Sequence, residues 1–158
     1  MKGDPAITDV LNEVLCAELS AVNQYFVHAK MCADWGYNSL ASHTRSEAID
    51  EMKHAEMMID RILFLEGVPN MQKYLKINIG PTVKEQFEFD VKLEYEAVDR
   101  LNRGIALCRD KGDNATREIL EKLLNDEEQH VDWLETQLHL IDSIGSERYL
   151  SQKLGEGS

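Results

Sequence analysis

Apolar residues recur at helical spacing through four long stretches of the chain. Steps of three, four or seven residues separate most of them, as expected for one face of an α-helix. Stretches this long are typical of an elongated all-α bundle. The four apolar stripes run through Ile7, Leu11, Leu15, Val22, Tyr25 and Ala29; through Leu40, Thr44, Met58, Ile62 and Leu65; through Val83, Phe87, Val91, Val98, Leu101, Ile105 and Cys108; and through Ile119, Leu123, Leu134, Leu138 and Ile141.

Helix boundaries follow from prolines, glycines and capping residues. Helices are predicted over residues 5–34, 38–65, 82–110 and 114–143, with a short fifth helix over 146–154, in one domain spanning 1–158. The short turns at 34–38 and 110–114 each carry a Gly to end one helix and an Asn to cap the next. Helices joined this way are expected to be antiparallel neighbours. The tail at 155–158 is expected to fray.

The connection between the second and third helices is long. At full extension the 16 residues Gly67–Thr82 reach at most about 53 Å, whereas a helix of ~28 residues is about 42 Å long. The segment can therefore run the length of the bundle and begin the third helix at the opposite end. Because Leu75, Ile77 and Ile79 alternate with polar residues, we expect part of this crossover to be extended and half-buried.

Charge and composition narrow the classes of function. The chain has 17 Lys and Arg against 29 Asp and Glu, a net charge of −12, which disfavours nucleic acid and anionic membranes as partners and favours cations. No apolar run approaches the ~18 residues of a membrane span, and the N-terminus lacks a signal-peptide core. Cys16, Cys32 and Cys108 form no CxxC motif, which favours reduced thiols. We expect a soluble, cytoplasmic protein.

Six residues of metal-ligand type interrupt the apolar stripes, and they obey an internal repeat. Each pair is separated by 76 residues, as are the two short turns. Counted from residue 36 or 112 in the nearer turn, Glu18 and Glu94 lie about 18 residues before it, and the two Glu-x-x-His pairs are centred about 16 residues after it. All six are therefore expected at one level in the middle of the bundle. The pairs are Glu18 and Glu94, Glu51 and Glu127, and His54 and His130.

This set of residues predicts a paired-metal site. Four carboxylates buried together need compensation, and two divalent cations supply +4 against −4 while both histidines stay neutral. The spacing in Glu51-x-x-His54 and Glu127-x-x-His130 puts both side chains on one helix face. Carboxylate and imidazole ligands without thiolate favour iron or manganese over structural zinc. The alternative, solvated charges on a shifted helix face, does not explain the repeat.

With these residues placed, the chain resembles the bacterioferritin family along essentially its whole length. The resemblance rests on the six residues, on Met52 directly after Glu51, on the long crossover and on the short last helix. It implies a ferritin-like antiparallel four-helix bundle with a di-iron centre of two iron ions per subunit. It also implies ferroxidase activity that converts Fe(II) to Fe(III) with O₂ or peroxide, and storage of ferric mineral in a homo-oligomeric 24-subunit shell built from two-fold dimers.

The resemblance assigns a role to each residue of the centre. Glu51 and Glu127 would bridge the two irons, Glu18 and His54 would complete one, and Glu94 and His130 the other. Tyr25 would lie beside the centre as an electron donor, with a core tyrosine as the alternative. Asp50 would face the shell interior and guide iron, with a solvated acid as the alternative. Ser46 stands where relatives can carry a histidine, which weakens the case for an inner-surface iron site beside Asp50.

Met52 belongs to a different face of the second helix. It lies about 100° around the helix from Glu51, in a second apolar stripe of Ala48, Ile49, Met52, Ala55, Ile59 and Leu63. A second apolar face on a buried helix indicates contact with another subunit. The resemblance implies that Met52 from each of two subunits ligates a haem b at their interface, and that a ferredoxin-type partner reduces the stored iron. A packing methionine is the alternative.

Two other functions remain open from the sequence. One is a non-storage di-iron or di-manganese peroxidase or catalase of the ferritin-like superfamily. A rubrerythrin-like peroxidase would normally bring a cysteine-rich iron domain, and the chain has no CxxC motif. The other is a helical shell that retains iron or haem without catalysis. Fe(II) oxidation in air, combined with size-exclusion chromatography, separates the three.

Overall fold

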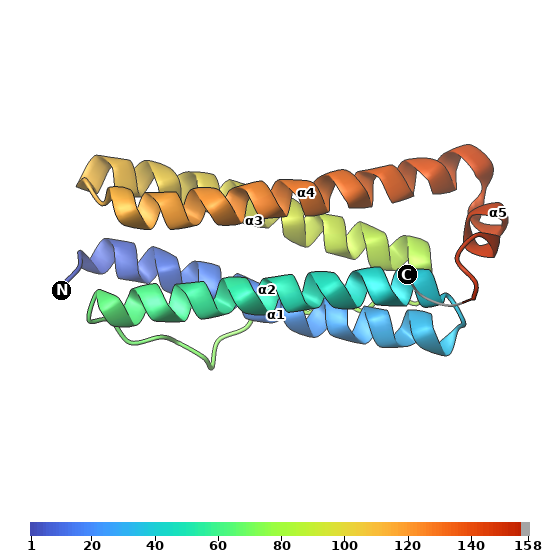
Figure 1. The fold of residues 1–158 in the computed structure, drawn as a ribbon, viewed down its shortest axis with the longest axis horizontal. Helices are drawn as coiled ribbons and strands as arrows, with labels where there is room; N and C mark the ends of the chain where they lie inside the picture. Colours follow the sequence, from blue (N-terminus) through green and yellow to red (C-terminus); the bar gives the residue numbers. More distant parts are fainter. Residues whose placement is uncertain (156–158) are drawn as a thin grey trace.

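A computed structural model describes residues 1–155 as four long helices and one short one. They are α1 (Pro5–Asp34), α2 (Asn38–Phe64), α3 (Val83–Lys111), α4 (Asn114–Ile144) and α5 (Ser146–Ser151). Figure 1 shows α1 beside α2 and α3 beside α4, and the two pairs stack into one elongated bundle. The all-α bundle with a long crossover and a short last helix is confirmed.

The four long helices begin and end within one residue of the predicted bounds, and three other details differ. The helix α5 ends at Ser151 and not at 154. Asn38 and Asn114 are the first helical residues of α2 and α4, so neither is the cap. The residue before each is the cap. Asp113 makes the capping hydrogen bond that was expected of Asn114, because its side chain accepts the backbone N–H of Thr116 at 3.0 Å. Apart from Gly155, the tail expected to fray lies outside the described residues.

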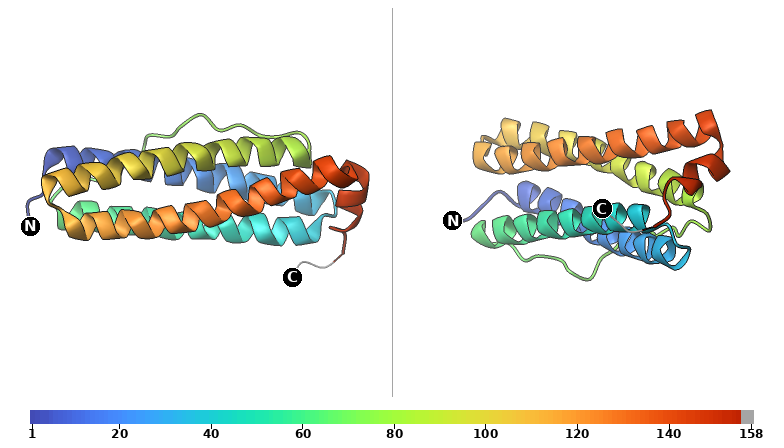
Figure 2. Two further views of the ribbon diagram at one scale, coloured as in Figure 1. Left: turned by 90° about the horizontal axis from the view of Figure 1, so that it is seen from above. Right: turned by 45° about the vertical axis from the view of Figure 1, so that its right-hand side comes forward.

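The crossover runs along the bundle on the α1 side, from the end of α2 to the start of α3 (Figures 1 and 2). Four polar side chains on α1, spaced by four or eight residues, each accept a backbone N–H of the crossover. The bonds run from Asn70 to Asn12 Oδ1 (2.8 Å), Leu75 to Ser20 Oγ (2.8 Å), Asn78 to Gln24 Oε1 (3.1 Å) and Gly80 to His28 Nε2 (3.0 Å).

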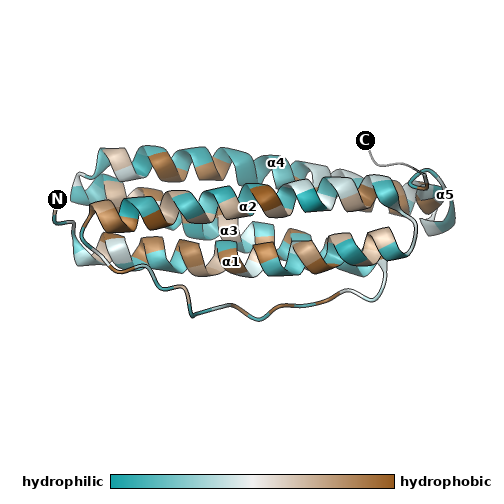
Figure 3. Ribbon diagram, turned by 60° about the horizontal axis from the view of Figure 1, so that its bottom comes forward, coloured by the Kyte–Doolittle hydropathy of each residue, from teal (hydrophilic) through white to brown (hydrophobic). Residues whose placement is uncertain are grey.

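These bonds explain how a segment without helix or strand is held in place. Ser20, Gln24 and His28 are buried, so each would be costly without its partner. The apolar alternation contributes less than expected. Part of the crossover is half-buried as predicted, at Leu75 and Ile77, whereas Ile79 is 44% exposed. Figure 3 shows the crossover as an irregular segment apart from the helices, with both apolar and polar residues along it.

The hydrophobic core is divided into two main clusters, one toward each end of the bundle. One joins α1, α2, α3 and α4 through residues such as Leu11, Met58 and Leu123. The other includes Leu40, Phe87, Leu134 and Ile141. Tyr149 of α5 packs into the second cluster. The six metal-ligand-type residues lie in neither cluster. The middle of the bundle is therefore left for polar side chains. No described helix has an apolar stretch that could cross a membrane.

Candidate metal centre

The structure brings the six predicted residues together, although they come from all four long helices. None is more than 7% exposed. Their potential ligand atoms form two groups, and within each group the atoms lie within 4.8 Å of one another. The groups are Glu18, Glu51, His54 and Glu127, and Glu51, Glu94, Glu127 and His130. Glu51 and Glu127 belong to both groups, which is the arrangement of two adjacent metals with two shared carboxylates.

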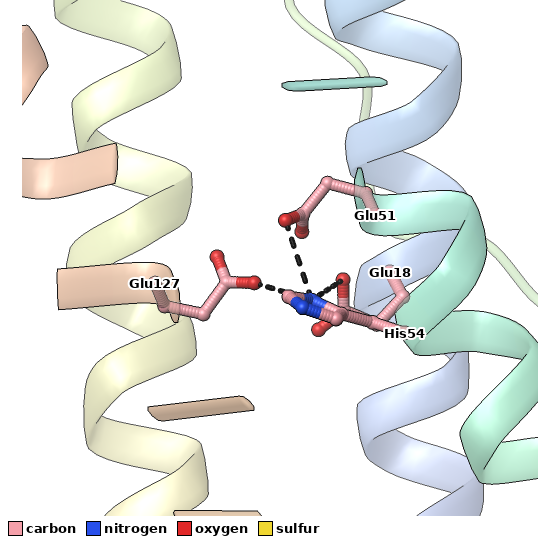
Figure 4. Close-up of side chains that lie close together, drawn as sticks. All are labelled: Glu18, Glu51, His54 and Glu127. Carbon is pink, nitrogen blue, oxygen red and sulfur yellow. Dashed lines mark ion pairs between the residues drawn. The ribbon is translucent and has the colours of Figure 1, made fainter. Parts of the chain in front are cut away.

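Both histidines direct the same nitrogen toward the carboxylates. His54 Nδ1 lies 2.8 Å from Glu127, 3.5 Å from Glu51 and 3.6 Å from Glu18, as Figure 4 shows. His130 Nδ1 lies 3.3 Å from Glu51, 3.4 Å from Glu94 and 3.6 Å from Glu127. The two Nδ1 atoms are therefore the nitrogens available to a metal.

Several atoms of the centre are buried without a hydrogen-bond partner. They are Glu18 Oε2, Glu51 Oε1, Glu94 Oε2, both carboxylate oxygens of Glu127, and Nδ1 of His54 and of His130. The close distances above are those of ion pairs, but the angles are not those of hydrogen bonds. A buried polar atom without a partner costs about 1–3 kcal/mol. Their convergence on shared carboxylates fits a pair of cations, and the oxygen and nitrogen donors fit iron.

Burial and the close approach of charged groups shift the pKa of the residues in the centre. Burial, followed by repulsion from neighbouring carboxylates, raises the pKa of Glu18, Glu51 and Glu94. Burial also opposes the ionisation of Glu127, but its close contacts with Glu94 and both histidines outweigh burial and hold its pKa well below the usual range. Burial opposes protonation of His54, yet Glu127 and Glu18 raise its pKa to about 11.

Tyr25 is buried directly beside the centre. Its hydroxyl donates a hydrogen bond to Glu94, and burial and the Glu94 charge raise its pKa well above the usual value. Asp50 is half-buried at the edge of the centre, with Oδ2 3.4 Å from His130 Nε2. Ser46 and Asp50 both line a cavity of about 980 Å³ between α2 and α4.

Two acidic residues near the centre were not predicted, the partly exposed Asp126 and the buried Asp90. Asp126 lies 2.9 Å from His54 Nε2, as Asp50 lies near His130. Asp50 and Asp126 are themselves 76 residues apart, so the internal repeat was a signal that could have found Asp126. Asp90, one turn before Glu94, accepts hydrogen bonds from Gln24 (2.8 Å) and His28 Nδ1 (2.9 Å). Its partners lie on another helix, and the repeat holds no sign of it.

The apolar stripe around Met52 is divided by the structure. Met52 and Ile49 are 43% and 44% exposed, and Leu63 is exposed as well. Ala48 and Ala55 are buried instead, because small side chains at these positions face into the bundle; on this point the predicted stripe is wrong. Phe26 of α1 is another exposed apolar side chain, at 44%. Met52 thus lies outside the metal centre, on an apolar outer face.

The remaining chemistry-bearing residues lie elsewhere. Cys16, Cys32 and Cys108 are buried free thiols. His28 is buried in the hydrogen-bond network of the crossover, and His43 stacks on Trp133 with ring centroids 3.7 Å apart. His139 is exposed. In the described residues 1–155, neither the cysteines nor these histidines join a potential metal-binding group.

A four-helix bundle with two carboxylate–histidine groups that share two glutamates defines a class, the ferritin-like metal proteins. The sequence model described as "Ferritin-like domain" matches residues 8–144. The chain is 52% identical to the bacterioferritin of Mycolicibacterium paratuberculosis over 152 residues, covering 96% of each chain. It is 50% identical to the bacterioferritin of Streptomyces coelicolor, covering 96% of this chain and 90% of the relative.

The solved structures agree with the sequence comparison. The structure of Mycobacterium tuberculosis bacterioferritin, BfrA, superposes with a TM-score of 0.97 at 50% identity and covers 98% of both chains. The chain therefore belongs to the ferritin family and, within it, to the bacterioferritins.

Proposed function

We propose that this protein is an iron-storage ferroxidase, which oxidises Fe(II) at the paired-metal centre and deposits Fe(III) as mineral inside a protein shell. The observation that carries the proposal is the pair of four-residue groups that share Glu51 and Glu127. Two adjacent irons can deliver two electrons to one oxidant molecule in a single event. The names of the bacterioferritin relatives support the same function.

The protein's part in the reaction is binding, charge compensation and proton exchange. Glu18 and His54 would hold one Fe(II), Glu94 and His130 the other, and Glu51 and Glu127 both. Two Fe(II) lose one electron each, and O₂ takes up two electrons and two protons to become hydrogen peroxide. With hydrogen peroxide as oxidant, the O–O bond breaks and two waters form. Protons that the cations displace from the carboxylates and histidines are available for either reduction.

Storage requires an assembly, and we propose a 24-subunit shell built from two-fold dimers. The bacterioferritin relatives support this assembly. The net charge of −12 per chain, multiplied over many subunits, produces a field that concentrates Fe(II). The cavity of about 980 Å³ beside the centre would then open toward the shell interior and receive the oxidised iron. A ferredoxin-type protein is the proposed reductant for iron release.

The face around Met52 fits a haem b shared by two subunits. An exposed thioether on an apolar surface offers a soft, neutral ligand to haem iron, and two such faces would enclose the flat apolar ring. When bound, the haem would supply electron transfer toward the stored mineral. Met52 from each subunit would hold its iron, with the exposed Ile49, one turn earlier on α2, as an apolar neighbour.

The competing function is a peroxidase or catalase that stores nothing. Adding Fe(II) in air and then separating the products by size-exclusion chromatography distinguishes the two. Fast oxidation that yields a very large particle loaded with iron is the result we expect. Fast peroxide turnover by a small oligomer would favour the peroxidase. Oxidation no faster than the protein-free blank would leave a binding shell without catalysis.

A further inference from the structure

Two openings reach the metal centre from different sides of the bundle. The cavity of about 980 Å³, named here the acidic pocket, is lined by residues of α2 and α4, including Asp50 and His130. A second, narrow cavity of about 10 Å³ lies mainly between α1 and α3 and is lined by Glu18 and Glu94 of the centre. A volume of this size accommodates about one water molecule. The centre therefore has one wide access and one narrow access.

The narrow cavity adjoins a pocket at the protein surface. A pocket of about 440 Å³, named here the entrance pocket, is formed by α1, α3 and the crossover. Leu75 and Arg100 line both the entrance pocket and the narrow cavity. Leu75 is held in place by its backbone N–H, which donates to Ser20 Oγ at 2.8 Å. Leu75 and Arg100 thus stand between the entrance pocket and the narrow cavity that Glu18 and Glu94 line.

The walls of the narrow cavity suit a small, uncharged molecule. Besides the glutamates of the centre, they consist largely of short or apolar side chains, among them Ala17, Ala21, Leu93 and Ala97. Glu18 Oε2 and Glu94 Oε2, which lack hydrogen-bond partners, belong to the residues at its inner end. A hydrated divalent cation would lose its water shell in such a passage, whereas O₂ and hydrogen peroxide carry no charge to desolvate.

The charges of the two routes are opposite in sign. The acidic pocket carries Glu47, Asp50, Glu128 and Asp132, and none of the described residues lining it is Lys or Arg. The entrance pocket carries three cations against two acids, the cations being Lys73, Arg100 and Arg103, and the acids Asp9 and Glu13. The acidic pocket attracts Fe(II), while Arg100 at the mouth of the narrow cavity repels it.

We propose that the narrow cavity is the passage by which the neutral oxidant reaches the metal pair, and that Arg100 excludes Fe(II) from it. Fe(II) arrives instead through the acidic pocket. This inference rests on the proposed ferroxidase function and assigns its two substrates to separate routes. O₂ takes two electrons from the two Fe(II) and two protons from the centre, and leaves as hydrogen peroxide, which is small and neutral enough to return through the same passage.

Obstruction of the passage tests the route of the oxidant. Ala97→Leu adds three carbon atoms to the wall of a cavity with room for about one water. Ala106→Leu is the matched control, because Ala106 is an exposed alanine on the same helix and lines neither pocket. Stopped-flow measurement at limiting O₂ is expected to show oxidation slowed about tenfold in Ala97→Leu and unchanged in Ala106→Leu. Ala97→Val, a smaller obstruction, is expected to give an intermediate rate.

Anaerobic binding of Co(II) separates this effect from damage to the centre. Ala97→Leu is expected to bind two Co(II) per subunit with wild-type rate and affinity. Slower Co(II) binding with an unchanged dependence on O₂ would make the narrow cavity a metal route and overturn the proposal. Unchanged behaviour in both measurements would overturn it as well. Blank-like oxidation by the wild type, in contrast, would refute the ferroxidase function itself.

Neutralising two acids of the acidic pocket and reversing the charge of residue 100 tests the role of Arg100. The double variant Glu128→Gln with Asp132→Asn is expected to slow anaerobic Co(II) loading without changing the dependence on O₂. Arg100→Glu added to this background opens a second access for cations and is expected to restore much of the loading rate. Arg109→Glu, the same charge change at an exposed residue near the end of α3, is the control. If Co(II) loading stays slow after Arg100→Glu is added to the double variant, Arg100 does not exclude cations from the narrow cavity.

Discussion

His54 Nε2 lies 2.9 Å from a carboxylate oxygen of Asp126, a residue on α4 that is 72 positions later in the chain. The contact directs the other nitrogen of the ring, Nδ1, toward Glu127 and Glu18. Asp50 and His130 form the same pair in the other half of the bundle at 3.4 Å. A carboxylate behind each histidine fixes the ring orientation, as is common around metal-binding imidazoles.

Replacement of Asp126 tests this positioning role. Asp126→Asn keeps the shape of the side chain but loses the charge that orients His54. Replacing a residue that contacts a metal-binding histidine from behind typically lowers metal affinity about 10–100-fold. We expect an anaerobic Co(II) titration to show one weakened and one unchanged site per subunit. Asp142→Asn, at an exposed position of α4, should change neither. Equal weakening of both sites would indicate a general disturbance of the bundle.

Removal of a first ligand is expected to have a larger effect. Glu18→Ala, Glu94→Ala and His130→Ala should each slow the fast oxidation of the first two Fe(II) per subunit by orders of magnitude. Assembly should persist in the two glutamate variants, because removing one buried carboxylate relieves repulsion in the metal-free bundle. Stopped-flow absorbance and size-exclusion chromatography measure the two properties, with Glu96→Ala on the exposed side of α3 as control. Fast oxidation in all three variants would refute the assignment of the centre.

Metal binding should release protons at neutral pH. Glu127 and Glu18 raise the pKa of His54 to about 11. Burial and neighbouring carboxylates raise the pKa of Glu51 and Glu94 well above the usual range. Cations must displace these protons, so affinity should rise with pH, about tenfold per pH unit for each proton released. Calorimetric titration of Co(II) in buffers of different ionisation enthalpy counts the protons. A heat that is independent of the buffer would contradict the prediction.

The centre could be predicted from sequence because its residues break two regular patterns at once. Glu18 and Glu94 fall where an apolar side chain is due, and the repeat of 76 residues aligns the two halves. The structure then gathers them through helix geometry alone, since residues at one level of a bundle must meet. Asp126 escaped notice because it is one-third exposed and looks like an ordinary surface acid.

Other features could not be read from the sequence for physical reasons. Ser20, Gln24 and His28 are polar residues at helical spacing, but their partners are backbone N–H groups of the crossover. Such donors are present in almost every residue, so the sequence carries no sign of which will bind. The capping error at the start of α4 arose because Asp113 and Asn114 are adjacent and both favour the cap position.

The cap of α4 also links two helical hairpins and should contribute measurably to stability. Asp113 accepts from the backbone of Thr116 and lies 3.3 Å from Arg61 of α2. Asp113→Ala is expected to cost about 1 kcal/mol and lower the thermal midpoint in circular dichroism. Asp60→Ala, at an exposed position of α2, should have little effect.

The contribution of Asp113 should also depend on pH with a defined sign. Burial opposes its ionisation, but the hydrogen bonds from Thr116 and the Arg61 charge outweigh burial and lower the pKa of Asp113 below its ordinary value of 3.8. A depressed pKa in the folded state means that the stabilisation is present above about pH 4 and is lost as the pH falls further. The difference between wild type and Asp113→Ala should therefore shrink in acid. A difference that grows in acid would refute this account.

Replacement of Met52 separates the haem from the metal centre. Met52→Leu conserves volume on the exposed face of α2 and should cost less than about 1.5 kcal/mol in packing. The sulfur is lost, so the purified variant should lack the haem absorption band. Because Met52 lies on a different face from Glu51 and His54, the initial rate of Fe(II) oxidation should be unchanged. Release of stored iron should slow, since haem is the proposed route for electrons to the mineral.

Met58→Leu, in the buried core, is the control for methionine replacement and should keep its haem. If the Met52→Leu protein carries a full complement of haem, Met52 is a packing residue and the proposed haem site is wrong.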